Sequence, residues 1–176
     1  MIKTTFFLVA LLLLAAFAFA QGQPADSARP AACGAPDIRF DVKTDKETHP
    51  AQPEAGKALV YFIQDDSAFA SRPRPTTKMG IDGEWVGATH SNSYFYVSVN
   101  PGVHHLCASW QTGEGSEEVE VAAAHFTAEA GGVYYFDAKN AYGREVSKSI
   151  SLNLLDSDEG PLMTNRFSFS SSRPKK

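Results

Sequence analysis

The stretch from Lys78 to Trp110, KMGIDGEWVGATHSNSYFYVSVNPGVHHLCASW, constrains the fold more than any other part of the chain. Asp82-Gly83 is typical of a two-residue type I′ turn, because both central positions of that turn need a positive φ, which Asp and Gly tolerate. Asn100-Pro101-Gly102 is a second turn signal, which lies between the alternating runs Tyr94–Val99 and Val103–Trp110. The stretch therefore predicts two successive β-hairpins.

The register of the first hairpin follows from its turn. A two-residue loop pairs three residues with three others: Ile81 with Glu84, Gly80 with Trp85, and Met79 with Val86. Side chains alternate between the faces of a strand, so we expect Met79, Ile81 and Val86 on a core face. Trp85 then lies opposite Gly80 on the other face, where its ring can cover the glycine backbone.

The side chains of the expected strand Tyr94–Val99 alternate between two faces. Phe95, Val97 and Val99 point one way, and Tyr94, Tyr96 and Ser98 point the other way. We interpret this as a half-buried antiparallel strand with an aromatic outer face.

Further strands are expected at Asp37–Lys43, Lys57–Gln64, Val119–Phe126, Val133–Lys139 and Arg144–Leu155. Lys57–Gln64 is apolar on both faces, which is typical of a central strand, and Asp37–Lys43 carries the charges of an edge strand. Asp65–Thr76 is expected to be a loop because of its prolines, and Ser157–Met163 one helical turn. The fold class is all-β: a single antiparallel β-sandwich, Ig-like or PEGA-like, of roughly seven or eight strands.

The N-terminus has the features of a signal peptide over residues 1–20. Lys3 precedes an apolar run, and Ala18-Phe19-Ala20 is a cleavage signal before Gln21. The alternative, an uncleaved membrane anchor, fits less well, since the run is shorter than the roughly 20 residues of a membrane span. We expect an exported protein, periplasmic or extracellular, without a transmembrane segment in the mature chain.

The mature chain divides into three parts. Residues 21–56 are a lead-in with the edge strand at 37–43 and a linker, residues 57–160 are the β-sandwich domain, and residues 161–176 are a flexible tail. The chain has 20 acidic and 16 basic residues. This acidic balance argues against nucleic acid as a partner, because nucleic-acid-binding surfaces are basic.

Cys33 and Cys107 are the only two cysteines. In an exported protein they are expected to form one disulfide that ties the N-terminal segment to the core; the alternative is two unpaired thiols. The absence of a Cys-x-x-Cys motif argues against a redox-active role.

The histidines predict no metal site. His104 and His105 are neighbours in a strand and point to opposite faces, so they cannot easily hold one ion together. His49 and His90 lie in expected loops, and His125 lies at the end of another strand. We expect neither a metal nor another cofactor.

No catalytic signature is present either. The chain has no G-x-S-x-G motif, and the acidic pairs Asp65-Asp66 and Glu117-Glu118 are expected to be solvated clusters in loops. Asp156–Gly160 lacks the ligand pattern of a calcium loop. We therefore expect no catalytic residue and no enzyme, although a site assembled from distant residues leaves no sequence signature.

Four aromatic residues are candidates for ligand contact: Trp85, Tyr94, Tyr96 and Trp110. On an outward face their rings could stack on sugars or bury a partner's side chain. The other interpretation is that a second sheet covers them, since a sandwich buries the inner face of each sheet.

Four segments in this order resemble the DUF2846 family: KALVYFIQD (57–65), IDGEWVG (81–87), SYFYVSVNPGVHHL (93–106) and FTAEAGGVYYFDAK (126–139). These are small exported bacterial domains, often lipoproteins, of uncharacterised function. The resemblance implies a β-sandwich and supplies no catalytic residues. In this chain no cysteine directly follows the apolar run, so the lipoprotein route is not indicated.

The expected function is an exported, non-catalytic module that binds an envelope protein or glycan. One alternative is a carbohydrate-binding module that uses the aromatic face. A second alternative is an envelope hydrolase.

Overall fold

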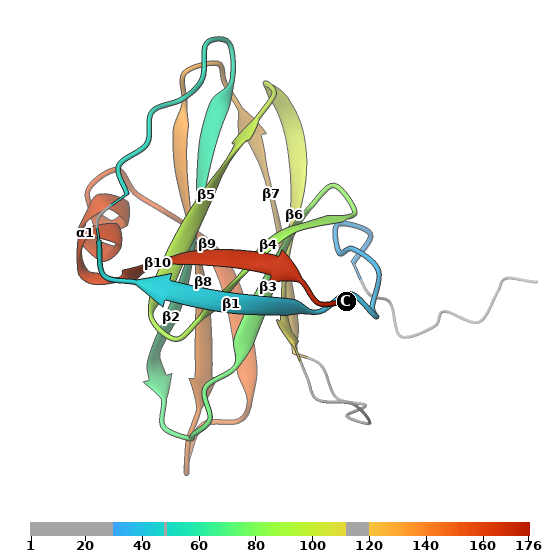
Figure 1. The fold of residues 1–176 in the computed structure, drawn as a ribbon, viewed down its shortest axis with the longest axis vertical. Coiled ribbons are helices and arrows are strands. Elements are labelled where there is room, and N and C mark those ends of the chain that lie inside the picture. Colours follow the sequence, from blue (N-terminus) through green and yellow to red (C-terminus); the bar gives the residue numbers. More distant parts are fainter. Residues whose placement is uncertain (1–29, 48, 112–119) are drawn as a thin grey trace, which may run out of the picture.

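The computed structural model describes residues 30–47, 49–111 and 120–176 (Figure 1). The expected signal peptide and the first residues of the lead-in lie outside this part of the chain. In the described residues, no helix has the length and apolar character needed to span a membrane.

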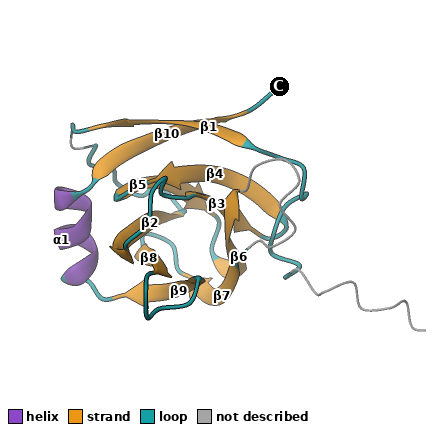
Figure 2. Cartoon of the chain, turned by 90° about the horizontal axis from the view of Figure 1, so that it is seen from below, coloured by secondary structure: helices purple, strands orange, loops and turns teal. Residues whose placement is uncertain are grey.

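The described chain forms ten strands and one helix. In order these are β1 (Phe40–Asp45), β2 (Ala58–Phe69), β3 (Thr76–Ile81), β4 (Glu84–His90), β5 (Ser93–Val99), β6 (Gly102–Gln111), β7 (Val121–Ala128), β8 (Val133–Tyr142), β9 (Ser149–Leu155), α1 (Glu159–Arg166) and β10 (Ser168–Pro174). Two sheets pack together, with the short helix near the C-terminus (Figure 2). The expected all-β sandwich is confirmed.

The six-stranded sheet has the order β1-β10-β5-β2-β8-β9, and the four-stranded sheet has the order β4-β3-β6-β7. Most pairs are antiparallel, as expected, but β2 pairs with β8 and β10 pairs with β5 in parallel. The prediction that all strands pair antiparallel is therefore wrong. Both parallel pairs join strands that are distant in sequence, and a long connection leaves the strand direction free.

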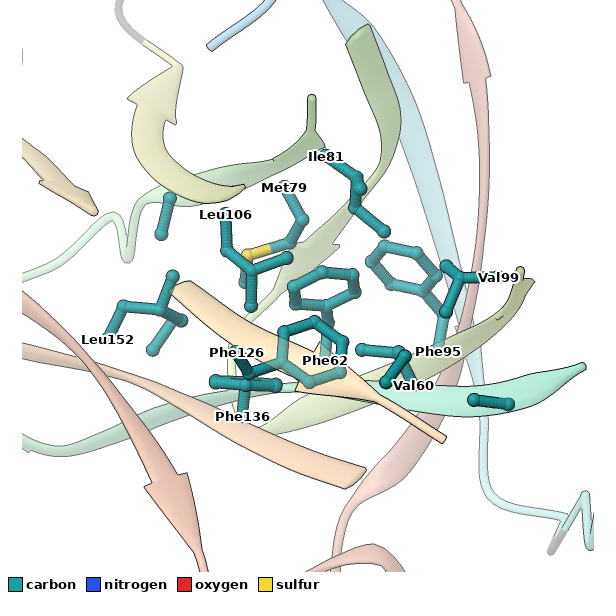
Figure 3. Packing of buried hydrophobic residues seen from close by; sticks show 14 residues of the cluster. Val60, Phe62, Met79, Ile81, Phe95, Val99, Leu106, Phe126, Phe136 and Leu152 are labelled. Carbon is teal, nitrogen blue, oxygen red and sulfur yellow. The ribbon is translucent and has the colours of Figure 1, made fainter. Parts of the chain in front are cut away.

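The core between the sheets is built around phenylalanines. Phe62 of β2, Phe95 of β5, Phe126 of β7 and Phe136 of β8 meet Met79 and Leu106 of the four-stranded sheet (Figure 3). The centres of the Phe126 and Phe136 rings lie 5.0 Å apart. The predicted inward set Phe95, Val97 and Val99 belongs to this core.

Strand β2 is central, as predicted, because it pairs with both β5 and β8. It also runs on to Phe69, with an irregularity between Asp65 and Ala68. The prediction of a loop from Asp65 is therefore wrong for its first residues. The irregularity takes up one extra residue of β2, and the pairing with β8 resumes at Ala68.

The first hairpin has the predicted register next to its turn, where Ile81 pairs with Glu84 and Gly80 with Trp85. Beyond it a β-bulge places Gly87, not Val86, opposite Met79. A Cβ at Gly87 would come within 2.8 Å of the Phe95 ring. The bulge thus brings a glycine to the point where a core ring leaves no room.

The C-terminal segment is ordered, so the prediction of a flexible tail over residues 161–176 is wrong. The predicted helical turn is present as α1, and β10 pairs antiparallel with β1 and in parallel with β5. The ring of Phe169 packs against Tyr94 and Tyr96, with centres 5.6 Å away in each case. This burial stabilises a segment whose serine-rich sequence suggests disorder.

Strand β1 lies at the end of the six-stranded sheet, as predicted for an edge strand, although it covers Phe40–Asp45. Figure 1 shows β1 and β10 side by side across the sandwich.

Candidate functional site

A cavity of about 400 Å³ lies between the N-terminal segment and the four-stranded sheet. Its wall consists of Pro30, Ala31, Ala32, Asp82, His105, Leu106, Ala123 and Ala124. Six of these eight residues are apolar, and none is Phe, Tyr or Trp. Asp82 and His105 supply the polar groups. We refer to it as the N-terminal cavity.

The disulfide Cys33–Cys107 holds the N-terminal segment on the sheet, with 5.1 Å between the two Cα atoms. This confirms the predicted pairing. The amide of Gly83 donates to the carbonyl of Ala32 over 3.1 Å. A Cβ at Gly80 would lie only 2.9 Å from the same carbonyl oxygen, so a glycine there lets the segment lie close to the sheet.

Trp85 and Lys78 secure the next part of the N-terminal segment. The indole Nε1 of Trp85 donates to the carbonyl of Ala35 over 2.7 Å, and the Nζ of Lys78 donates to the carbonyl of Ile38 over 2.9 Å. The Lys78 ammonium also lies 4.4 Å from the centre of the Trp85 ring. As predicted, the Trp85 ring covers Gly80. Trp85 thus anchors the segment that follows the cavity wall.

Asp82 organises the edge of the cavity. It has a φ of 52° in the turn, and its Oδ1 accepts the amide of His105 over 2.8 Å while its Oδ2 lies 2.7 Å from Nδ1 of His104. Burial raises the pKa of Asp82, but the hydrogen bonds from His105 and His104 outweigh it, so the pKa lies below its ordinary value.

The surroundings of His104 favour its charged form. Its Nε2 lies 2.8 Å from the carbonyl of Asn100, so both ring nitrogens face acceptors and both must donate. Burial lowers the pKa of His104, yet the bond to Asn100 and the Asp82 carboxylate raise it above its ordinary value. With both nitrogens engaged, this ring is arranged as a structural ion pair and not as a free base.

His105 and His125 face each other across β6 and β7, with ring centres 6.2 Å apart. The sequence alone does not show that these two histidines lie opposite each other. The pairing register of the two strands is the signal that could have related them. In the described residues, no group of three or more His, Cys, Asp or Glu side chains could hold a metal ion.

The four predicted ligand-contact aromatics do not share a surface. Trp85 lies beside the N-terminal segment, whereas Tyr94 is 1 % exposed and Tyr96 half-buried on the outer face of the six-stranded sheet. There Phe169 and Met163 of the C-terminal segment pack against them. Trp110 is 8 % exposed. Trp110 is covered by the other sheet, where it meets Asn140 of β8, as the core interpretation has it, whereas Tyr94 is buried by the C-terminal segment and not by the second sheet.

Trp110 belongs to a buried polar network. Its Nε1 donates to Oδ1 of Asn140 over 2.7 Å, and the Asn140 amide donates to Asp66 over 2.7 Å. Gln64 also donates to Asp66, and Arg74 lies 3.7 Å from it. Burial raises the pKa of Asp66, while the bonds from Asn140 and Gln64 counteract the rise. Asp66 is fully buried, so the prediction of a solvated Asp65-Asp66 pair is wrong, because β2 continues through it.

A comparison with protein-family models matches residues 54–150 to the family described as "Protein of unknown function (DUF2846)". No curated protein and no solved structure matches the chain. The cavity wall is composed of matched residues, such as Asp82 and His105, and of Pro30–Ala32, which precede the match.

Proposed function

The chain belongs to the DUF2846 family, and from this premise we propose that it is an exported, non-catalytic module that binds a protein of the bacterial envelope through the N-terminal cavity. Export is supported by the signal-peptide features of residues 1–20. The Cys33–Cys107 disulfide fits an oxidising compartment.

The cavity itself is the observation that carries the proposal. It combines apolar walls with a few polar groups, the composition typical of a binding pocket. A volume of about 400 Å³ has room for one or two side chains of a partner. The disulfide at Cys33 and the hydrogen bond from Gly83 to Ala32 hold one wall on the sheet, so little ordering entropy is lost when a partner binds.

A protein partner is favoured over a glycan by the chemistry of the lining. Sugar sites generally offer a large aromatic ring for stacking, and the cavity has no Phe, Tyr or Trp among its lining residues. A non-catalytic role is supported by the engaged polar atoms, since both oxygens of Asp82 and both ring nitrogens of His104 already have partners.

Co-sedimentation of the purified protein with envelope fractions tests the proposal. We expect it to pellet with untreated envelope, and to stay in solution with protease-treated envelope or with purified peptidoglycan sacculi. Pelleting with the protease-treated material or the sacculi would instead support the carbohydrate-binding alternative. A protein that never pellets would contradict envelope binding, and turnover in a hydrolase panel would contradict the non-catalytic role.

A substitution in the cavity wall assigns the binding to this site. Ala123→Glu puts a charge into the wall at an exposed position of β7, and we expect it to abolish pelleting. Thr127→Glu is the matched control, because Thr127 is exposed on the same strand and the same face, away from the lining residues. If Ala123→Glu pelleted with the untreated envelope as well as Thr127→Glu does, the cavity would be excluded as the binding site.

A further inference from the structure

We propose that His105 and His125 chelate a divalent transition-metal ion on the outer face of the four-stranded sheet. The two residues are direct partners in the antiparallel pairing of β6 with β7. Both are exposed, and their ring centres lie 6.2 Å apart with 38° between the ring planes. His105 also lines the N-terminal cavity, but the inference rests on the histidine pair and needs no protein partner.

The hydrogen bonds of His105 identify the type of pair. Its amide donates to Oδ1 of Asp82 over 2.8 Å, and its carbonyl accepts the amide of Asp82 over 2.9 Å. Both groups therefore point to the β3–β4 turn and away from β7. His105 and His125 thus form a non-hydrogen-bonded pair, the kind in which opposite Cα atoms approach to about 4.5 Å and side chains lie closest.

The ring separation is slightly larger than a single ion needs. A zinc-type ion lies about 2.0–2.1 Å from an imidazole nitrogen, hence roughly 3.2 Å from the ring centre. Two rings on one ion then have centres about 4.5 Å apart at a metal angle of 90° and about 5.2 Å apart at the tetrahedral angle. The observed separation is 6.2 Å, so rotation of the exposed side chains has to bring the rings about 1 Å or more closer to bind the ion.

The remaining ligands would be water. Asp82 lines the cavity beside His105, but its two oxygens are already bonded to His104 and to the amide of His105. Asp82 therefore supplies no ligand to the ion, and its charge is already paired with His104. Two imidazoles with water select Cu²⁺, Ni²⁺ or Zn²⁺, since Mg²⁺ and Ca²⁺ prefer oxygen ligands.

Calorimetric titration of the metal-free, untagged protein with Ni²⁺ and with Zn²⁺ tests the inference. We expect one saturable site that Mg²⁺ and Ca²⁺ do not fill, and a higher melting temperature in the presence of Ni²⁺. Loss of an outer-shell partner typically weakens metal binding about 10–100-fold, so removal of a ligand should cost at least about tenfold. Absence of saturable binding would overturn the inference.

Variants identify the ligands. His105→Ala and His125→Ala should each weaken Ni²⁺ binding at least about tenfold, and the double variant should lose little more, because the chelate acts as a unit. His90→Ala removes a histidine from β4 of the same sheet and should leave the affinity unchanged. If His105→Ala does not fold, His125→Ala decides alone. Wild-type affinity in His125→Ala, or an equal loss in His90→Ala, would overturn the inference.

Discussion

Gly160, in the first turn of α1, lies directly against the ring of Tyr135 in β8. A Cβ at position 160 would overlap the Cγ and Cδ2 atoms of that ring. The Tyr135 ring in turn stacks on Tyr61 of β2, with centres 4.8 Å apart. The missing side chain of Gly160 therefore lets the helix dock onto the outer face of the six-stranded sheet.

Gly160→Ala should destabilise the protein by about 1–3 kcal/mol, because the added methyl group forces the helix away from Tyr135. In a helix, alanine is normally favoured over glycine by about 1 kcal/mol. At position 160 we expect the opposite, because the clash with Tyr135 outweighs this preference. Urea unfolding measures the difference. Gly143→Ala is the control, since its Cβ would meet only Ala70 at 3.7 Å. A Gly160→Ala variant as stable as the wild type would exclude close docking of α1.

Replacement of both Cys33 and Cys107 by alanine should lower the free energy of unfolding by about 4 kcal/mol in the chain-entropy description. The bond joins residues 74 positions apart in the sequence, so it removes considerable freedom from the unfolded chain. Urea unfolding of the double variant and of the wild type measures the loss. The same comparison in a reducing buffer is the control, and there the difference should disappear. A persistent difference would show that the substitutions act by another route.

The ion pair between Asp82 and His104 should stabilise the fold within a limited pH window. The raised pKa of His104 gives stability that is complete below about 6.5 and is lost as the pH rises through the folded value. The lowered pKa of Asp82 gives stability that is complete above about 3.9 and is lost as the pH falls. The contribution of the pair is thus largest between about pH 4 and 6.5.

The variant His104→Gln tests this window. The gap between the wild-type and variant urea midpoints should be widest near pH 5 and should narrow above neutral pH, where His104 loses its proton. His90→Gln, at a ring that lies 3.3 Å from the Thr76 hydroxyl, is the control. A gap that is constant from pH 5 to 8 would mean that packing, and not charge, is responsible.

The features that could be predicted from the sequence are those that depend on neighbouring residues or on very few possible partners. The Asp82-Gly83 turn set the pairing of Gly80 with Trp85, and strand alternation placed Phe95 in the core and Tyr94 on the other face. Export chemistry predicted the pairing of Cys33 with Cys107. Each of these follows from residues close in sequence or from the small number of cysteines.

The features that were missed depend on distant contacts. Strand β10 forms because Phe169 reaches the tyrosines of β5 and because Ser170 bonds to Ser93 over 2.8 Å, which a serine-rich segment does not reveal. The meeting of His105 and His125 depends on the register between β6 and β7, which no short turn fixes. The N-terminal cavity likewise needs Pro30–Ala32 to lie over the sheet.

Asp137 is a buried acidic residue with one oxygen that lacks a hydrogen-bond partner among the described residues. It is 6 % exposed on β8, and the oxygen concerned is Oδ1. Burial, followed by the charge of Asp65, raises the pKa of Asp137 to about 7, while Lys139 opposes the rise. An acid with a raised pKa in the folded state binds a proton on folding, so stability falls as the pH increases through the window between the two pKa values.

Asp137→Asn should therefore change how stability depends on pH. As the pH rises from about 4 to 7, the free energy of unfolding of the wild type should fall by on the order of 2–4 kcal/mol relative to the variant. Above this range the difference between the two proteins should stay constant. Urea unfolding at several pH values measures the difference, and carbon NMR of the Asp137 carboxyl group should give a midpoint near the value of about 7. Asp37→Asn, at an exposed position, is the control. If the two variants show the same pH dependence, Asp137 is ionised in the folded protein, and a cation or an ordered water must then neutralise or solvate it.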